Sequence, residues 1–381
     1  MLLVFINNKL VTIDTITPIL LEMKEKYGVN SHIVLTGELA WSGIKDNVVI
    51  DDAINKFGSL VYLGYGFNNR LIRLFFSIIQ IQKLLLFALL GAKIIHFGSL
   101  NSGVLNLIFR KFSKNIFFSQ SISFEYTGDK YRYSKNIKPT IPVGDSLIVT
   151  NNLMPELKLK EVKFKKKYIF GPTRTRKSWL NHSYFNAEYY LEKYHPMVNY
   201  KDGFIVIILY TFGKVVWFDD DNTAEKLLRE TLKTIHDTFP EKTIMLKPHV
   251  VTQIDFLKKI IDTSGCDNIE ITYLHPSVLS RFSNVFISNC YSATLADASS
   301  LGVPTIEYTN YRDDLLLRTG NKSVSHNFVD YFINKDSSHL KEVLLKIMQN
   351  NGGLIDQKIL VEKIDTDDSE LLKNLQQGKI F

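Results

Sequence analysis

Short apolar runs alternate along the first half of the chain with segments in which apolar residues recur at helical spacing. The run Met1–Ile6 stops sharply at Asn7, which is typical of a strand buried on both faces of a parallel sheet. Thr17 and Pro18 then mark the start of a helix that should end near Tyr27. Further strands are predicted at residues 32–35, 48–50, 93–97, 116–118 and 146–149, and further helices at 69–90 and 104–112.

The second half repeats the alternation. Its predicted strands are residues 204–210, 243–246, 269–273, 285–287 and 304–308, and its predicted helices are 223–239, 255–262, 292–301, 340–349 and 368–376. Alternating strands and helices predict parallel sheets with right-handed crossovers. The expected fold class is α/β, with two doubly wound, Rossmann-like domains facing a cleft. The expected divisions are residues 1–165 for the first domain, 166–202 for the interdomain connection, 203–350 for the second domain and 351–381 for a C-terminal helical tail.

The most apolar stretch of the chain runs from Leu71 to Ala92. It reaches the length of a membrane-spanning helix, but Arg73 and Lys83 interrupt it, together with two glutamines. We therefore predict a helix buried in the protein and keep an interfacial membrane helix as the alternative. The first residues lack the basic region and the cleavage site of a signal peptide, so none is expected.

Composition narrows the class of protein. Hydrophobic residues make up 45% of the 381 residues and charged residues 22%, which excludes a long disordered or collagen-like chain. Two cysteines, Cys266 and Cys290, cannot form a disulfide framework and favour a reduced, cytosolic setting. The net charge of +7 suits anionic ligands such as nucleotides, phosphates or an anionic membrane surface. It is too diffuse to indicate nucleic acid.

The clearest candidate site follows the strand predicted at residues 285–287. Small hydroxyl residues gather there where the strand gives way to a helix, and the first backbone N–H groups of a helix have no partners within it. Together with the helix dipole, these N–H groups can bind an anion. The alternative is plain capping of the helix by Ser292. The residues that could donate to an anion are Ser288, Asn289, Ser292 and Thr294.

The segment that follows, residues 295–308, indicates a helix, a tight turn at Gly302-Val303-Pro304 and a strand. It resembles the nucleotide-binding half of GT-B glycosyltransferases, in which an acidic residue and an alanine in the helix precede Gly-x-Pro-x-Ile. Asp297 stands at the acidic position, where glutamate is commoner. In retaining members this carboxylate often holds the ribose hydroxyls, and the resemblance implies that contact for Asp297.

A second motif, Lys247-Pro248-His249, ends the strand predicted at residues 243–246. This motif and the serine-rich helix start further along the chain are similar to the pattern of bacterial sialyltransferases, Kdo transferases and CDP-glycerol glycerophosphotransferases. In those families the histidine and the serines hold the donor's phosphate, so the resemblance implies that role for His249 beside Lys247. His275, before Pro276, either shares this role or caps the helix that follows it.

Other cations could meet anionic groups. Lys214 follows a glycine turn after the strand predicted at residues 204–210, where it could contact the donor's phosphates or lie on a bare surface turn. Arg174, Arg176 and Lys177 stand together in the connection. They could clamp an anionic sugar or headgroup, or form a solvated run of charge.

An inverting glycosyl transfer needs one base to take the proton of the acceptor hydroxyl. Asp14 is the first candidate, because the loop after the first strand should lie at the carboxyl edge of the first sheet; Glu125 and His96 follow. Asp14 could instead cap the helix at Pro18. Asp219–Asp221 resembles the acidic metal motif of another glycosyltransferase fold, but it precedes a helix, which favours capping. We expect no metal and no cofactor, because the nucleotide sugar would be a substrate.

These features predict a metal-independent GT-B glycosyltransferase of bacterial surface-glycan synthesis, acting on capsule or lipopolysaccharide. The first domain would bind the acceptor and the second the nucleotide sugar, with a CMP-sugar favoured. The alternatives are transfer of a polyol phosphate from a CDP-activated donor, a sugar-nucleotide 2-epimerase, and a non-catalytic partner in glycan assembly. The expected location is the cytoplasm, with transient contact with the inner face of the membrane, where a lipid-linked glycan acceptor would lie. No nucleic-acid partner is expected.

Overall fold

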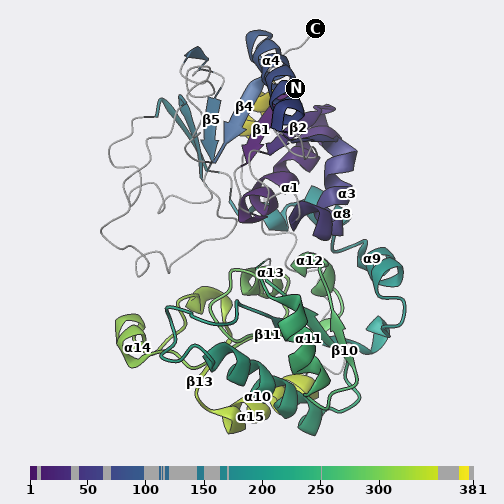
Figure 1. Cartoon of the computed structure of the whole chain (residues 1–381), viewed down its shortest axis with the longest axis vertical. Coiled ribbons are helices and arrows are strands. Elements are labelled where there is room, and N and C mark those ends of the chain that lie inside the picture. The colour runs from purple at the N-terminus through teal and green to yellow at the C-terminus, as the bar shows by residue number, and fades with distance from the viewer. Residues whose placement is uncertain are drawn as a thin grey trace. The chain divides into compact units, whose positions relative to one another are not determined.

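The computed structural model of the chain consists of two compact units (Figure 1). It describes residues 1–6, 10–35, 43–62, 70–97, 111–112, 114, 116–119, 144–149, 164–169, 171–249, 251–350 and 369–376. The first unit holds the described residues up to Trp179 together with the last helix, α16 (Ser369–Gln376). The second unit holds the described residues from Leu180 to Asn350.

The first unit is built on a seven-stranded sheet with the order β3-β2-β1-β4-β5-β6-β7, and every pair of neighbouring strands is parallel. The predicted parallel sheet is confirmed. Strand β1 lies inside the sheet, between β2 and β4, and is fully buried, as its uninterrupted apolar run indicates. The strands are β1 (Leu2–Ile6), β2 (Ser31–Leu35), β3 (Gly58–Tyr62), β4 (Lys93–His96), β5 (Ile116–Ser119), β6 (Ser146–Val149) and β7 (Lys166–Ile169).

The strand predicted at residues 48–50 is wrong. Helix α3 (Val48–Phe57) occupies this position, and the side chain of Asn47 accepts a hydrogen bond from the N–H of Ile50 at its start. The apolar residues of the whole segment recur at helical spacing and line one buried face, a pattern that a window of three residues cannot reveal. The chain then enters β3 directly at Gly58, where a Cβ would lie 1.7 Å from the carbonyl oxygen of Ser31.

The segment 166–202, predicted as the interdomain connection, contains an edge strand of the first sheet. Strand β7 pairs with β6 and buries only Tyr168, while Lys166 and Lys167 face solvent. Lysines commonly protect the edge of a sheet from pairing with another chain. In the sequence, the lysines of β7 look like a run of solvent-exposed charge and conceal the strand. The segment continues with a 3₁₀ turn, η2 (Thr173–Thr175), and helices α8 (Lys177–His182) and α9 (Ala187–Tyr194).

The first helix is also longer than predicted. Helix α1 runs from Leu10 to Tyr27, so Thr17 does not cap it and Pro18 lies inside it. Proline has no N–H and cannot donate the usual hydrogen bond to the carbonyl of the residue four positions earlier, here Asp14. The helix keeps its course because its inward face is buried, from Ile13 and Ile16 to Met23. Burial therefore outweighs the local cost of the proline.

Helix α4 (Arg70–Leu89) corresponds to the apolar stretch, but the prediction that it is buried is wrong. Among the described side chains of the helix, the two that are buried, Leu84 and Ala88, lie in its C-terminal part and pack on the sheet. Among the described residues, it is the one helix long and apolar enough to cross a membrane, and little of it is buried.

The second unit is built on a six-stranded sheet with the order β10-β9-β8-β11-β12-β13, again parallel throughout. Its strands are β8 (Phe204–Ile208), β9 (Ile244–Lys247), β10 (Ile269–Ile271), β11 (Ser283–Ser288), β12 (Thr305–Thr309) and β13 (Tyr331–Asn334). Besides α9, its helices are α10 (Thr223–Thr238), α11 (Ile254–Asp262), α12 (Pro276–Leu279), α13 (Leu295–Ser300), α14 (Asp313–Thr319) and α15 (Ser337–Asn350). The predicted second parallel sheet is confirmed, and β13 is an addition.

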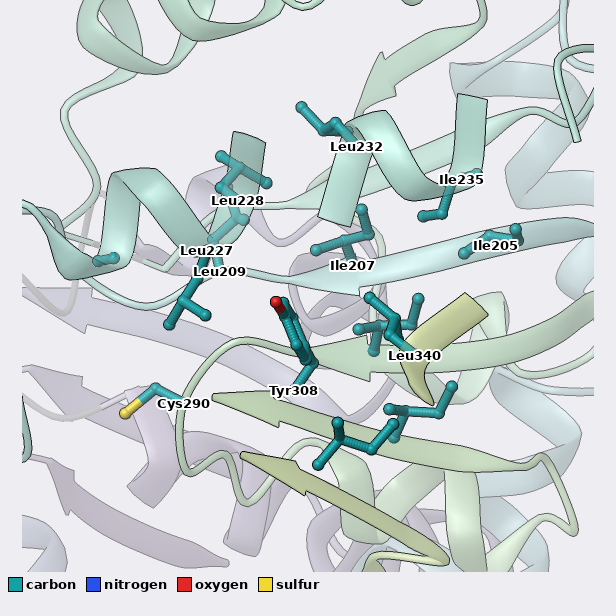
Figure 2. Close-up of a cluster of buried hydrophobic side chains, with 14 of the residues drawn as sticks. Ile205, Ile207, Leu209, Leu227, Leu228, Leu232, Ile235, Cys290, Tyr308 and Leu340 are labelled. Atoms are coloured by element: carbon teal, nitrogen blue, oxygen red, sulfur yellow. The ribbon is translucent and has the colours of Figure 1, made fainter. Parts of the chain in front are cut away.

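The core of the second unit lies between this sheet and the helices α10 and α15 (Figure 2). Ile205 and Ile207 of β8 belong to it, together with Tyr308 of β12 and a row of leucines from α10. Each such fully buried side chain stabilises the fold by roughly 1.5–3 kcal/mol. Because side chains alternate along a strand, Ile208 and the residues in register with it face the opposite side of the sheet.

The junction between α3 and β3 yields a stability prediction. Gly58→Ala should lower the free energy of unfolding by about 3 kcal/mol, because the new methyl group would overlap the backbone of β2. Urea denaturation measures this change. Gly265→Ala is the matched control, since its φ of +73° is unfavourable for alanine but the space around it is open, and its cost should be about 1 kcal/mol. Equal losses in the two variants would contradict the close approach.

Candidate functional site

The carboxyl edge of the second sheet brings two of the predicted motifs near each other. Lys247 of β9 and Ser288 of β11 are both in register with Ile208 of the strand between them. Neighbouring strands lie about 4.8 Å apart, so the ends of β9 and β11 are separated by about 10 Å. The loops that carry His249 and Ser292 therefore start on either side of the chain that leaves β8.

His249 is exposed, which leaves it available to a ligand. Its Nδ1 accepts a hydrogen bond from the N–H of Val251 at 3.4 Å, which favours the tautomer with the proton on Nε2. The ring of Tyr210 lies 5.9 Å away, between centroids. Partial loss of solvation lowers the pKa of His249 below its ordinary value. At neutral pH the ring is therefore an uncharged Nε2–H donor, of the kind that can bind a phosphate oxygen.

Lys247 is placed differently from the prediction. Its ammonium group donates to the carbonyl oxygens of Leu274, at 2.8 Å, and Tyr273, at 3.4 Å. These contacts fasten the loop between β10 and α12 to the end of β9. Lys247 thus contributes a positive charge near this edge while it holds the main chain in place.

Two residues proposed as anion donors are used to hold their own loop. Ser288 is buried and its hydroxyl donates to the carbonyl of Cys290. Asn289 is also buried, and its Nδ2 donates to Thr231 Oγ1 at 2.8 Å and to the carbonyl of Tyr308 at 3.2 Å. Both side chains point into the protein, so the prediction that they donate to a ligand is wrong.

Donors that remain available lie one step further along the same loop. Ser292 Oγ accepts from the N–H of Thr294 at 3.2 Å, a bond within the turn that precedes the helix, whose cap position is Thr294 itself. The backbone N–H groups of Ser292 and Ala293 find no acceptor among the described residues, and Thr294 is only half-buried. Helix α13 begins at Leu295, later than predicted, and has only six residues, so its dipole adds little. The loop itself supplies the donors.

A buried network that the sequence analysis missed supports this loop. The hydroxyl of Tyr311 accepts a hydrogen bond from the N–H of Tyr291 at 2.6 Å and lies 3.9 Å from Cys290 Sγ. Tyr311 also hydrogen-bonds Glu307, whose other partner is the hydroxyl of Ser323 at 2.8 Å. The signal in the sequence is a lone acidic residue inside the apolar strand Thr305–Thr309.

Burial dominates the electrostatics of this network. Loss of solvation raises the pKa of Glu307 to about 7, although the hydrogen bonds from Ser323 and Tyr311 oppose the shift. Burial likewise raises the pKa of Tyr311 well above its ordinary value. The nearby Cys290 and Glu307 raise it further, with smaller effects. A carboxyl group in this setting keeps its proton up to about pH 7.

The remaining candidates in the second unit are divided by their exposure. Asp297 is 2% exposed, so its carboxylate is closed to a ribose in this structure. His275 is fully buried and its Nδ1 accepts from the N–H of Ser277 at 3.1 Å, which makes it the cap of α12. Lys214 is exposed beyond the turn at Gly213 and has no ion-pair partner among the described residues.

In the first unit, the predicted base lies in an ion pair. Asp14 belongs to helix α1 and not to a loop, and its Oδ2 lies 3.7 Å from Nη1 of Arg174. The side chain of Arg174 is 4% exposed and that of Asp14 is 19% exposed. A nearby guanidinium favours the charged carboxylate and weakens it as a base. The geometry therefore gives Asp14 a structural contact, and its catalytic role remains only a prediction.

The anion clamp proposed for the connection is wrong for both arginines. Arg174 pairs with Asp14, and Arg176 Nε donates to Glu22. Both carboxylates belong to α1, so the two arginines fasten η2 to that helix. The Arg176 pair helps to hold the pKa of Glu22 below its ordinary value, against the opposing effect of burial. Lys177 is exposed and stays available.

The other two candidate bases are not presented to a ligand by the described residues. His96 ends β4 and is 1% exposed. Glu125 lies outside the described residues. Asp220 accepts from the N–H of Asn222, the residue directly before the first residue of α10. Across the described ranges, no three potential metal ligands lie together.

Comparison with solved structures identifies the fold. The sequence matches no protein-family model and no curated protein sequence. The structure of UDP-GlcNAc 2-epimerase from Neisseria meningitidis, bound to UDP-GlcNAc, aligns with a TM-score of 0.57 and 12% identity, over 98% of this chain and 99% of that one. The wall teichoic acid polymerase TagF, solved with CDPG, aligns with a TM-score of 0.53 and 14% identity, over 98% and 87%. The chain has the GT-B fold.

A further GT-B structure, TcCGT1 in complex with UDP, aligns with a TM-score of 0.51 and 10% identity over 99% of both chains. The GT-B fold confirms the predicted architecture of two parallel-sheet α/β domains. The likeness to sialyltransferases and Kdo transferases has no counterpart among these structures and stays a prediction.

The ion pair of Asp14 predicts the outcome of Asp14→Asn. The change should lower the free energy of unfolding by about 2 kcal/mol, because it removes a negative charge that lies 3.7 Å from the buried Arg174. Turnover per folded molecule should stay near that of the unchanged protein. Thermal unfolding and a transfer assay measure the two effects, with the exposed Asp46→Asn as the control. A loss of kcat by about 10² or more at unchanged stability would restore Asp14 as the base.

The buried Glu307 predicts a pH dependence of stability. Because its pKa in the folded protein lies above the ordinary value of 4.5, the folded protein holds a proton that the unfolded chain releases, and stability falls as the pH rises from 4.5 to 7. Glu307→Gln removes this slope, so the variant should gain about 3 kcal/mol relative to the unchanged protein between about pH 5 and pH 8. Urea denaturation at the two pH values measures the gain. Glu342→Gln, at an exposed position, should leave the slope intact; the same slope in both variants would place the titration elsewhere.

Proposed function

We propose that the protein is a glycosyltransferase that takes its sugar from a nucleotide-activated donor. The observation that carries this proposal is the pair of loops at the carboxyl edge of the second sheet. One presents the uncharged imidazole of His249, and the other presents the N–H groups of Ser292 and Ala293 with the hydroxyl of Thr294. The ends of parallel strands in α/β sheets are the usual place for nucleotide ligands.

The donor's phosphate is the natural ligand of this arrangement. Hydrogen bonds from His249 Nε2 and from the loop N–H groups would bind its oxygens, and Lys247 and Lys214 would add positive charge nearby. These groups stabilise the charge that develops on the leaving phosphate during transfer, without a cation. A cytidine donor is favoured, because the Lys-Pro-His motif resembles the families that use CMP- or CDP-activated substrates. TagF, which has a similar fold, was solved with CDPG.

The acceptor and the setting belong to the same proposal. We expect the acceptor to be a bacterial surface glycan of the capsule or lipopolysaccharide type, and the reaction to occur in the cytoplasm. Two other reactions fit the same site. A polyol-phosphate transferase would use a CDP-activated donor, and a 2-epimerase, like the similar Neisseria enzyme, would act on a UDP-sugar. An epimerase would turn over its nucleotide sugar with no acceptor present, which separates it from a transferase.

Nucleotide binding through His249 is the direct test. Thermal unfolding with CMP, CDP, UDP and GDP should show the largest stabilisation with a cytidine nucleotide, because a ligand that binds only the folded state raises its stability. His249→Ala should weaken that nucleotide's binding about 10- to 100-fold, the loss expected for one hydrogen bond to a charged group. Its stability without ligand should change by less than about 0.5 kcal/mol, because the residue is exposed.

His339→Ala is the matched control, since this histidine is also exposed but lies on α15. It should leave the nucleotide shift unchanged. Unweakened binding in His249→Ala would remove the phosphate site from this edge. A clear preference for UDP would favour a uridine donor and would support the 2-epimerase alternative.

A further inference from the structure

Helix α4 exposes an unusual amount of apolar surface. Ten large hydrophobic side chains between Leu71 and Leu90 are at least 42% exposed, which is more than half of all such exposed side chains in the described part of the chain. The most exposed are Leu71, Leu74, Phe75 and Leu89. Soluble proteins rarely expose a contiguous apolar patch of this kind unless it binds something.

The buried side chains of the helix lie near its C-terminal end. Leu84 and Ala88, near its C-terminus, pack against Leu3, Phe5 and Val34 of the sheet. From Leu71 to Ile79 every side chain whose exposure is described faces solvent. Because the exposed residues in these first turns include direct neighbours in sequence, they cover more than one face of the helix. Within the described part of the chain, the core cluster that packs α4 on its sheet takes its buried α4 residues from the C-terminal half of the helix.

The charge around the helix indicates what it meets. No aspartate or glutamate occurs between Ala53 and Phe124, whereas that stretch carries eight lysines and arginines. Without these eight, the remaining 38 of the chain's 46 cationic residues face 39 acidic ones. The whole basic excess of the protein therefore lies in the stretch that contains α4. Arg70 and Lys83 of the helix are both exposed.

The topology of the sheet limits the orientation in which α4 could contact a membrane. A spanning helix would place the chain before it and the chain after it on opposite sides of the bilayer. Strand β3 precedes α4 and β4 follows it, and both belong to the same sheet of the first unit. Helix α4 can therefore lie in the plane of a membrane surface but cannot cross the bilayer with this fold intact.

We propose that α4 docks the protein on an anionic lipid surface, with the apolar side chains of its N-terminal half inserted between the headgroups and its cations bound to the lipid phosphates. The insertion depends on Leu74 and Phe75, and the electrostatic attraction on Arg70 and Lys83. This inference does not depend on the nature of the donor.

Vesicle co-sedimentation tests the proposal. The full chain should bind vesicles of phosphatidylcholine mixed with phosphatidylglycerol, and bind vesicles of phosphatidylcholine alone at least tenfold more weakly. Binding to the anionic vesicles should weaken at about 1 M salt, because salt screens the attraction. The double variant Leu74→Glu/Phe75→Glu should weaken binding at least tenfold, since two apolar side chains no longer insert. Arg70→Gln and Lys83→Gln should each weaken it about fivefold.

Met197→Glu and Leu317→Glu are the matched controls, because each places the same charge at an exposed apolar position of the second unit. They should bind vesicles as the unchanged protein does, and all variants should keep its circular dichroism and its thermal shift with nucleotide. Equal binding by Leu74→Glu/Phe75→Glu and the controls would overturn the proposal, as would no binding by the unchanged chain. A dimer in vesicle-free solution that this double variant converts to a monomer would assign the surface to a second copy of the chain instead.

Discussion

Polar side chains on one row of the second sheet fix the loops on which the proposed site depends. Lys247 and Ser288 are both in register with a residue of β8, the strand between them, and Glu307 is in register with Ser288. Each forms its contacts within the protein: Lys247 with the carbonyls after β10, Ser288 with that of Cys290, and Glu307 with Ser323 and Tyr311. Buried polar groups are costly unless they are paired, so these contacts are obligatory. The groups that remain for a ligand consequently sit one step beyond the strand ends, at His249 and Ser292 to Thr294.

This division explains which parts of the site could be predicted. The ends of strands β8 to β12 of the second sheet were predicted to within two residues, because an apolar run with polar ends is visible in a short segment, and the loops near His249 and Ser292 followed from them. The sequence did not show whether a polar side chain points to solvent or into the protein. His249 and His275 both flank a proline-containing step, yet one is exposed and the other caps α12 in full burial. That difference is set by packing from distant elements, on which the local sequence is silent.

The errors in the first unit have the same origin. Helix α3 was taken for a strand because its first three residues are apolar and β-branched, while its period becomes visible only over ten residues. Strand β7 was missed because an edge strand needs few apolar side chains and tolerates lysines. Asp14 and Arg174 are far apart in sequence, so nothing local reveals that the supposed base and the supposed anion clamp neutralise each other. Helix α4 was also predicted wrongly. Its apolar composition suggested that it is buried, but the fold leaves most of its described side chains exposed.

The position of α16 has a consequence for the order in which the protein matures. Leu371, Leu372 and Leu375 of this helix are buried, and the helix belongs to the unit that the N-terminus begins. Translation delivers β1 long before α16, so the apolar surface that α16 covers stays open until the strands of both sheets have been synthesised. The second unit, whose described residues are continuous in sequence apart from one position, can close its core earlier. Of the two units, the one whose synthesis starts earlier is therefore the one that is completed later.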